Sequence, residues 1–320
     1  MIRILVLLIA FLFGSGIALA DFKTVAPQAE RAGWKAKDHG KKFKLGLKGH
    51  GKKMPKQAVA PLKAMRAIPA SLDYRTQGFV SRVKDQGNCG SCWAFSATGV
   101  LESAIMLGKN LPNTNLDLSE QIVVSCDTGD EGCNGGYMDA VSDFLKTQGT
   151  GLEACYPYTA TDGSCAKACA DRSTYKVSNW GYVASTDPEV ATLKAALVTY
   201  GPLVTTMMVY SDFMYYSSGV YAYTSGSLEG GHAVILVGYD DGGQYFIVKN
   251  SWGTGWGESG YFRIAYSELK SKVLFGEETI YYAAGESPTP PVPPVPPSPG
   301  CNTNVGKPGA NTIIPWWKIW

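Results

Sequence analysis

The stretch Gln86 to Phe95, QGNCGSCWAF, constrains this chain more than any other because it leads directly into an apolar run. Apolar residues recur at helical spacing from Phe95 to Ile105, and Gly108 offers a stop, so we predict a long, largely buried helix that begins near Cys92. The start of a helix exposes backbone N–H groups and carries partial positive charge, which favours a thiolate. Cys92 is therefore expected to be acidic and nucleophilic.

By itself, the Cys89 and Cys92 pair fits a redox dithiol, half of a zinc site, or a structural cysteine beside a catalytic one. Zinc is disfavoured because the sequence has no second Cys-x-x-Cys and no nearby histidine pair. A thiol-disulfide oxidoreductase is disfavoured because Trp93 follows the second cysteine, whereas such proteins usually carry Trp before the first. We expect no metal and no other cofactor.

Residues 1–20, MIRILVLLIAFLFGSGIALA, read as a cleaved secretory signal peptide with a basic Arg3 and a small-residue end. The apolar run is short for a membrane span and is interrupted by Gly14 and Gly16, so no stable membrane span is expected. The sequence predicts a secreted protein, in an extracellular, periplasmic or lysosome- or vacuole-like compartment. Disulfides among its eight cysteines would persist there.

The rest of the chain has an uneven distribution of charge. Residues 21–67 hold thirteen Lys or Arg and three acids, a net charge of +10, whereas residues 68–320 carry −9. The basic segment is rich in Gly and Lys, which suits poor intrinsic order. A tail that attracts nucleic acid or an anionic surface would fit this charge. We favour a pro-segment that docks by charge on an acidic catalytic domain and inhibits it, and we expect no nucleic-acid partner.

The C-terminal part reads as a linker and a tail. Residues 286–300, ESPTPPVPPVPPSPG, form a Pro-rich spacer that cannot make a helix or a central strand. Residues 301–320, which end in IIPWWKIW, are too few for a domain. They could be a docking or sorting tag, a surface-binding aromatic tip or a disordered end. The folded body is therefore expected at residues 68–285.

The sequence of residues 68–285 predicts an α+β fold, with helices in its first half and strands in its second. Ser119 caps a helix before IVVSC, Gly135-Gly136 opens another over YMDAVSDFLK, and a short helix ends at Thr199. The segments PLVTTMMVY, HAVILVGY, QYFIVKN and GYFRIAY are rich in β-branched and aromatic residues, as strands are. Helices segregated from an antiparallel sheet indicate two lobes, with a cleft between them for the active site.

A nucleophilic thiol needs a base, and His232 is the sole histidine outside the segment expected to be removed. Asn250 ends the neighbouring predicted strand and could orient the imidazole. Trp252 follows in a Gly- and Trp-rich loop, where its ring could exclude water from the Asn–His bond. Gln86 could donate, beside the backbone N–H of Cys92, to the oxyanion that forms when a carbonyl is attacked.

Together these residues resemble the papain-like cysteine peptidases, whose signature Cys-Gly-Ser-Cys-Trp stands at Cys89 to Trp93. The resemblance runs from about Ile68 to Ala284. LSEQ at 118–121 and GCNGGYMDA at 132–140 look like cathepsin L and papain, whereas GGHA at 230–233 looks more like cathepsin B. The resemblance implies the papain-like two-lobe fold, with a helical lobe and an antiparallel sheet or barrel lobe. It assigns Cys92 as nucleophile, His232 as acid-base, Asn250 as its orienter and Gln86 as oxyanion donor.

The implied activity is that of a secreted cysteine endopeptidase, made as a zymogen, that cleaves protein or peptide substrates through a thioester. A non-catalytic binding protein with the same fold is the alternative. The resemblance also implies a substrate-binding surface, whose residues are Gly135, Gly136, Tyr137, Met138, Thr206, Gly230, Gly231, Trp252 and Ile280. Tyr137, Met138, Thr206, Gly230 and Ile280 should line the pocket for the substrate side chain one residue before the residue that supplies the scissile carbonyl. This pocket is expected to prefer an apolar or aromatic side chain.

Family pairing would join Cys89 to Cys133 and Cys126 to Cys165, and would leave Cys92 free. The third bridge usual in the sheet lobe is absent from the sequence, and Phe275 stands where one of its cysteines is expected. A local bridge between Cys155 and Cys169 is our hypothesis for the cysteines left nearby. Cys301 is then the odd cysteine, in the tail.

Overall fold

The computed structural model of the chain describes residues 22–49, 68–184 and 186–284. The predicted signal peptide, the Pro-rich linker, the C-terminal tail and Cys301 lie outside these residues. The described α-helices are α1 (Phe22–Arg31), α2 (Cys92–Gly108), α3 (Glu120–Cys126), α4 (Met138–Thr147) and α5 (Val190–Tyr200). None of them has the length and apolar character that a membrane crossing requires.

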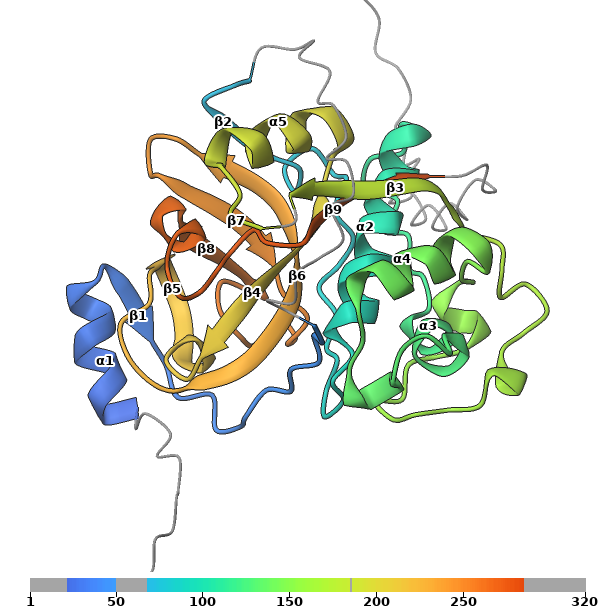
Figure 1. Cartoon of the computed structure of the whole chain (residues 1–320), viewed down its shortest axis with the longest axis horizontal. Coiled ribbons are helices and arrows are strands. Elements are labelled where there is room, and N and C mark those ends of the chain that lie inside the picture. Colours follow the sequence, from blue (N-terminus) through green and yellow to red (C-terminus); the bar gives the residue numbers. More distant parts are fainter. Residues whose placement is uncertain (1–21, 50–67, 185, 285–320) are drawn as a thin grey trace, which may run out of the picture. The chain divides into compact units, whose positions relative to one another are not determined.

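Helices α2, α3 and α4 pack together into one lobe, seen beside the sheet in Figure 1. Helix α2 begins at Cys92 as predicted, and every residue from Cys92 to Met106 is buried. A helix that is apolar on all sides must be covered on all sides, and α2 contacts both its neighbouring helices and the sheet strands β4, β6 and β9. It therefore forms the boundary between the helical lobe and the sheet.

The second lobe is a mostly antiparallel sheet. Its strands are β1 (Trp34–Ala36), β2 (Ser71–Asp73), β3 (Val177–Ala184), β4 (Leu203–Tyr210), β5 (Tyr216–Tyr221), β6 (Leu228–Asp240), β7 (Tyr245–Lys249), β8 (Tyr261–Ala265) and β9 (Thr279–Ala284). They run in the order β1-β5-β8-β7-β6-β4-β9-β3, with β2 paired to β6. The pair β5–β8 is parallel, against the expectation of a purely antiparallel sheet. The α+β architecture with two lobes is confirmed.

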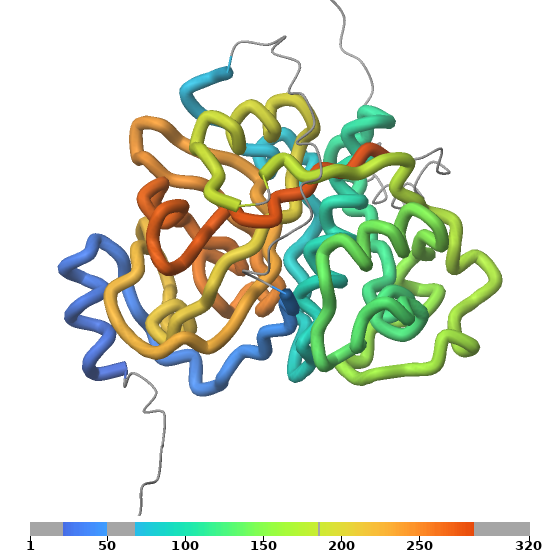
Figure 2. Tube along the Cα trace, viewed as in Figure 1, coloured from blue at the N-terminus to red at the C-terminus, as the bar shows by residue number. Residues whose placement is uncertain are grey.

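The N-terminal segment, residues 22–49, is ordered and not the poorly structured tail that its composition suggested. Strand β1 extends the sheet by pairing with β5, and the Trp34 ring is buried against Tyr216 and Tyr221. The chain then runs from the sheet to the junction with the helical lobe, as Figure 2 shows. These residues obtain their strand pairing and apolar contacts from the body of the protein, so their order here agrees with poor intrinsic order of the segment by itself.

Candidate active site

Cys92 is the first residue of α2, and Ser91 is its N-cap. An N-cap serine commonly accepts a hydrogen bond from the second or third N–H of its helix, but the Ser91 side chain makes no such bond. Backbone hydrogen bonding from Cys92 and Trp93 instead favours the thiolate of Cys92 by opposing the rise of its pKa. The free N–H groups of the helix start are thus directed at the thiol, as the sequence suggested.

The thiol is nevertheless not acidic in this form of the chain. Burial raises the pKa of Cys92 to about 11, although backbone hydrogen bonds from Ala233, Gly46, Trp93 and Cys92 itself oppose the rise. Because Cys92 is completely buried, the cost of desolvating a thiolate exceeds the gain from the helix start. The bias of the helix start toward thiolate is therefore outweighed by burial in this form, in which the N-terminal segment covers the sulfur.

The imidazole of His232 donates a 2.8 Å hydrogen bond from Nε2 to Oδ1 of Asn250. This bond leaves the lone pair on Nδ1, which has no hydrogen-bond partner among the described residues. Burial lowers the pKa of His232 to about 4, and the Asn250 bond opposes that shift. His232 lies inside β6 and does not open the strand as predicted, because pairing with β4 begins at Leu228.

Aromatic rings cover this pair. Trp252 stacks on His232 with ring centroids 4.8 Å apart, and Phe43 of the N-terminal segment stacks on Trp252 at 4.5 Å. Trp252 is only 2% exposed. The stacked rings exclude water from the His232–Asn250 bond, which strengthens it.

The carboxamide of Gln86 is fixed by several partners. Its Oε1 accepts a 2.6 Å bond from Oγ of Ser251, and its Nε2 donates to the carbonyl oxygens of Cys89 at 2.9 Å and Lys44 at 3.1 Å. Both N–H groups of the amide are therefore used. One of them bonds a carbonyl of the N-terminal segment.

The N-terminal segment lies directly on the thiol and on the walls beside it. Gly136 N–H donates to the Gly46 carbonyl at 2.8 Å, and Leu47 N–H donates to the Gly231 carbonyl at 3.2 Å. Gly46 is packed so closely on Gly90 that an added Cβ would collide with the Gly90 carbonyl oxygen. Only glycine lets the backbone approach Gly90, two residues before Cys92, in this way.

The residues expected to contact substrate divide into two groups. The glycine backbones face the N-terminal segment at Gly135, Gly136, Gly230 and Gly231. The side chains of Met138, Thr206 and Ile280 are buried, and Tyr137 is half-buried. Met138 and Ile280 belong to the same apolar cluster as Leu47, whereas the Thr206 hydroxyl donates to the Glu277 carbonyl.

Three disulfides join the expected partners, Cys89 to Cys133, Cys126 to Cys165 and Cys155 to Cys169. Among the described residues Cys92 is the free cysteine. The Cys89–Cys133 bridge ties the loop before Cys92 to the loop that carries Gly135 and Gly136. The disulfide thus links the start of α2 to one wall of the site.

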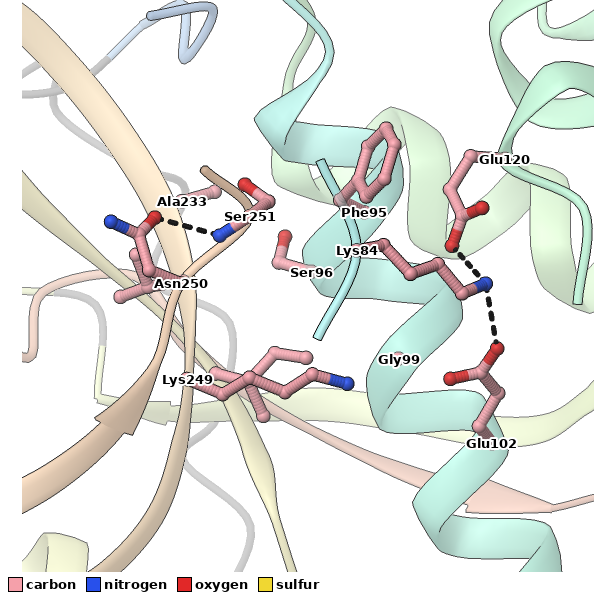
Figure 3. Close-up of a pocket in the computed structure, with 12 residues that line it drawn as sticks. Lys84, Phe95, Ser96, Gly99, Glu102, Glu120, Ala233, Lys249, Asn250 and Ser251 are labelled. Atoms are coloured by element: carbon pink, nitrogen blue, oxygen red, sulfur yellow. Dashed lines mark hydrogen bonds and ion pairs between the residues drawn. The ribbon is translucent and has the colours of Figure 1, made fainter. Parts of the chain in front are cut away.

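Buried charges lie behind the site on both sides of α2, with Glu102 and Glu120 on one side and Lys249, from the sheet, on the other (Figure 3). Lys84 bonds Glu102 at 3.0 Å and Glu120 at 2.7 Å. Burial alone would lower the pKa of Lys84, but Glu102, Glu120 and Asp117 raise it well above its ordinary value. Lys249, next to Asn250, donates to Ser81 Oγ at 3.0 Å, and burial lowers its pKa to about 8.

A cavity of about 20 Å³ separates these groups and is also lined by Asn250 and Ser251. It has room for a single water molecule. Since Ser81 in turn donates to Glu102 of α2, Lys249 and Ser81 connect β7 to α2 through polar groups. The strand end that carries Asn250 is anchored to the helix that carries Cys92.

Sequence reasoning missed several residues of this site. Ser91 immediately precedes Cys92, the candidate nucleophile. This position in the sequence was the only feature that could have indicated Ser91 as a residue of the site. Nothing in the sequence pointed to Tyr158, whose hydroxyl lies between Ser91 and the Gln86 carbonyl, or to Gly46. No group of three or more His, Cys, Asp or Glu side chains in the described ranges could hold a metal ion.

The comparisons with known proteins agree on one family. The profile of the papain family cysteine proteases matches residues 68–281. Cathepsin B-like CP3 of Giardia intestinalis is 43% identical over 224 residues, which cover 66% of this chain and 72% of the relative. A cathepsin L-like proteinase of Fasciola hepatica is 44% identical over 205 residues, 62% of this chain and 61% of the relative.

Solved proforms share the fold. Digestive procathepsin L 3 of Tenebrio molitor larval midgut has a TM-score of 0.63 and 28% identity, and the match covers 82% of this chain and 90% of that one. The proform of the ragweed pollen cysteine protease Amb a 11 has a TM-score of 0.59 and 31% identity, over 69% and 68% of the two chains.

The close approach of Gly46 to Cys92 generates a prediction. Gly46→Ala should push the segment off the thiol and raise the rate at which iodoacetamide labels Cys92 in the intact chain at neutral pH, roughly tenfold or more. Lys42→Ala, a change at an exposed position in the same segment, is the control and should label like the wild type. Equal, slow labelling of Gly46→Ala would show that the segment does not shield the sulfur.

Proposed function

The chain belongs to the papain family of cysteine proteases, and we propose that Cys92 is the nucleophile with which it hydrolyses peptide bonds. It is a cysteine endopeptidase made as a zymogen. The observation that carries the assignment is the 2.8 Å bond between His232 and Asn250, next to a sulfur that bonds the backbone of Ala233. Asn250 holds Nε2 protonated, so Nδ1 is the nitrogen free to act as a base.

In the proposed reaction His232 takes the proton from Sγ of Cys92, and the thiolate attacks the carbonyl carbon of the substrate. The C–N bond then breaks, His232 returns the proton to the leaving amine, and a thioester remains. Water attacks this thioester with His232 again as the base and releases the acid. Gln86 Nε2 and the Cys92 backbone N–H stabilise the oxyanion in both steps.

Residues 21–67 are proposed to be the inhibitory pro-segment of the peptidase region, residues 68–285. Support comes from the described part, residues 22–49, which covers each element of the proposed machinery. Gly46 packs on Gly90 just before Cys92, the Lys44 carbonyl accepts from Nε2 of Gln86, and Phe43 covers Trp252.

The proposed substrates are proteins or peptides with an apolar side chain one residue before the residue that supplies the scissile carbonyl. Leu47 supports this preference, because it lies between Gly136 and Gly231 and is 9% exposed. It shares its apolar cluster with Met138 and Ile280, two of the expected pocket residues. A leucine of the segment thus occupies a position suited to a substrate side chain.

We assign residues 1–20 to a signal peptide, residues 286–300 to a linker and residues 301–320 to a tail, and propose that the protein enters the secretory route. The three disulfides support an oxidising compartment, since cytosolic proteins rarely keep such bridges.

The catalytic assignment predicts the effect of substitutions on peptide hydrolysis after the N-terminal segment has been removed. Cys92→Ser should lower kcat/KM roughly 10⁴-fold or more, and His232→Ala by roughly 10²–10⁴-fold, because the acid-base group is lost. Cys89→Ser removes a disulfide but not the nucleophile, and folded material should still hydrolyse peptides. Folded wild type without hydrolysis, or full activity in Cys92→Ser, would refute the assignment.

The contacts of the segment predict how it inhibits in trans. A peptide of residues 22–49 should inhibit the activated enzyme and keep most of its effect at high salt, because backbone bonds and stacked rings are insensitive to screening. The ion pairs Lys41–Asp85 and Lys48–Glu131 involve partly exposed side chains, which contribute little. This differs from the docking by charge that the sequence suggested.

The matched control is the same peptide with Gly46→Ala, which should inhibit at least about tenfold more weakly because it cannot approach Gly90. Steady-state kinetics over a salt series is the measurement. Inhibition that disappears at high salt would instead support the hypothesis that the segment binds the enzyme mainly through its positive charge.

A further inference from the structure

The hydroxyl of Tyr158 lies between the two parts of the chain that supply the proposed oxyanion donors. It donates a 2.9 Å hydrogen bond to the backbone carbonyl of Gln86, and Oγ of Ser91 lies 2.6 Å from it. A tyrosine hydroxyl has a single proton, and the Gln86 carbonyl can only accept. Ser91 must therefore be the donor in the second bond.

The orientation of the Ser91 hydroxyl is unusual for an N-cap. A hydroxyl that caps a helix accepts from a backbone N–H, but Ser91 points its hydroxyl at Tyr158 and makes no cap bond. The N–H of Cys92 stays available for an oxygen that develops beside the sulfur. Tyr158 thus affects the first turn of α2 through Ser91.

Tyr158 itself is held firmly. Its ring meets Phe95 of α2 edge to face at 4.8 Å, and its backbone N–H donates to Oε1 of Glu153 at 2.7 Å. Burial raises the pKa of the Tyr158 phenol above its ordinary value. The hydroxyl therefore stays protonated and continues to donate to the Gln86 carbonyl at any pH where the enzyme would work.

Gln86 is held from the opposite side by the sheet lobe. Its backbone N–H donates to the Ser251 carbonyl at 2.8 Å, and its Oε1 accepts from the Ser251 hydroxyl. Ser251 directly follows Asn250. With Ser251 on one side and Tyr158 on the other, the carboxamide of Gln86 has a fixed position relative to the backbone N–H of Cys92.

We propose that Tyr158 is a positioning residue for the oxyanion hole, which sets the spacing between the Gln86 side-chain donor and the Cys92 N–H by bonding Gln86 and Ser91 together. The inference rests on the proposed function, since it presumes that these two groups stabilise the oxyanion. A displaced donor weakens stabilisation of the transition state more than binding of the substrate. The loss should therefore fall on kcat.

The test compares Tyr158→Phe with the wild type, both expressed as the full chain and activated by removal of the N-terminal segment. Phenylalanine keeps the ring packed on Phe95 and removes the hydroxyl. We expect kcat to fall roughly 10- to 100-fold with KM nearly unchanged. Ser91→Ala should lower kcat in the same way, because it removes the other end of the link.

Two inhibitors separate positioning from a general disturbance of the site. A peptide aldehyde forms an adduct with Cys92 whose oxygen occupies the oxyanion hole, and its affinity should fall by the same factor as kcat/KM. Iodoacetamide alkylates the thiol without forming an oxyanion, and its rate should be unchanged. In a Gln86→Ala background, Tyr158→Phe should have little further effect, because the donor it positions is already gone.

The matched control is Tyr239→Phe, which also removes a hydroxyl bonded to a backbone carbonyl, that of Pro69 at 2.8 Å, near the far end of β6. It should leave kcat unchanged. Equal kcat in Tyr158→Phe and wild type, an equal loss in Tyr239→Phe, or slower alkylation in step with the loss of kcat would each overturn the proposal. A wild type that does not hydrolyse peptides would instead refute the proposed function.

Discussion

The N-terminus of helix α2 is the feature on which the rest of the site depends. It presents N–H groups to the sulfur of Cys92, and these stabilise a thiolate. The same helix is buried along nearly its whole length, so the sulfur is also far from water when the cleft is covered. The helix start lowers the pKa of the Cys92 thiol and burial raises it. In this form the effect of burial is larger, and the pKa of Cys92 is about 11. The reactivity of the thiol is therefore governed by what covers it.

The two lobes meet at this helix, and polar links hold them together. Ser251 connects the strand end at Asn250 to Gln86, and Lys249 connects the same strand through Ser81 to Glu102 of α2. Buried charges of this kind are costly unless every group is paired. Their position between the lobes suits a site that needs Cys92 on one side and His232 on the other in a constant geometry.

Much of this arrangement follows from the sequence because it depends on local patterns. Apolar spacing and Gly108 predicted α2, the Ser119 cap was found with its hydroxyl bonded to the Ile122 N–H, and His232 and Asn250 were expected on neighbouring strands. The bonds of the Tyr158 hydroxyl and the contact of Gly46 with Gly90 could not be predicted, since they join residues 44 or more positions apart along the chain. The order of residues 22–49 could not be predicted from their composition, because it comes from pairing with β5 and from contacts with the rest of the protein.

The central claim is that the N-terminal segment keeps Cys92 a neutral thiol, and that its removal lets the helix start and His232 stabilise the thiolate. The most direct measurement is a pH titration of the Cys92 thiolate by its ultraviolet absorbance, in the intact chain and after the segment has been removed, with Cys92→Ser as the blank. The account predicts that the intact chain titrates well above the ordinary cysteine value and that the processed enzyme titrates below it. An equally low pKa in both forms would contradict it.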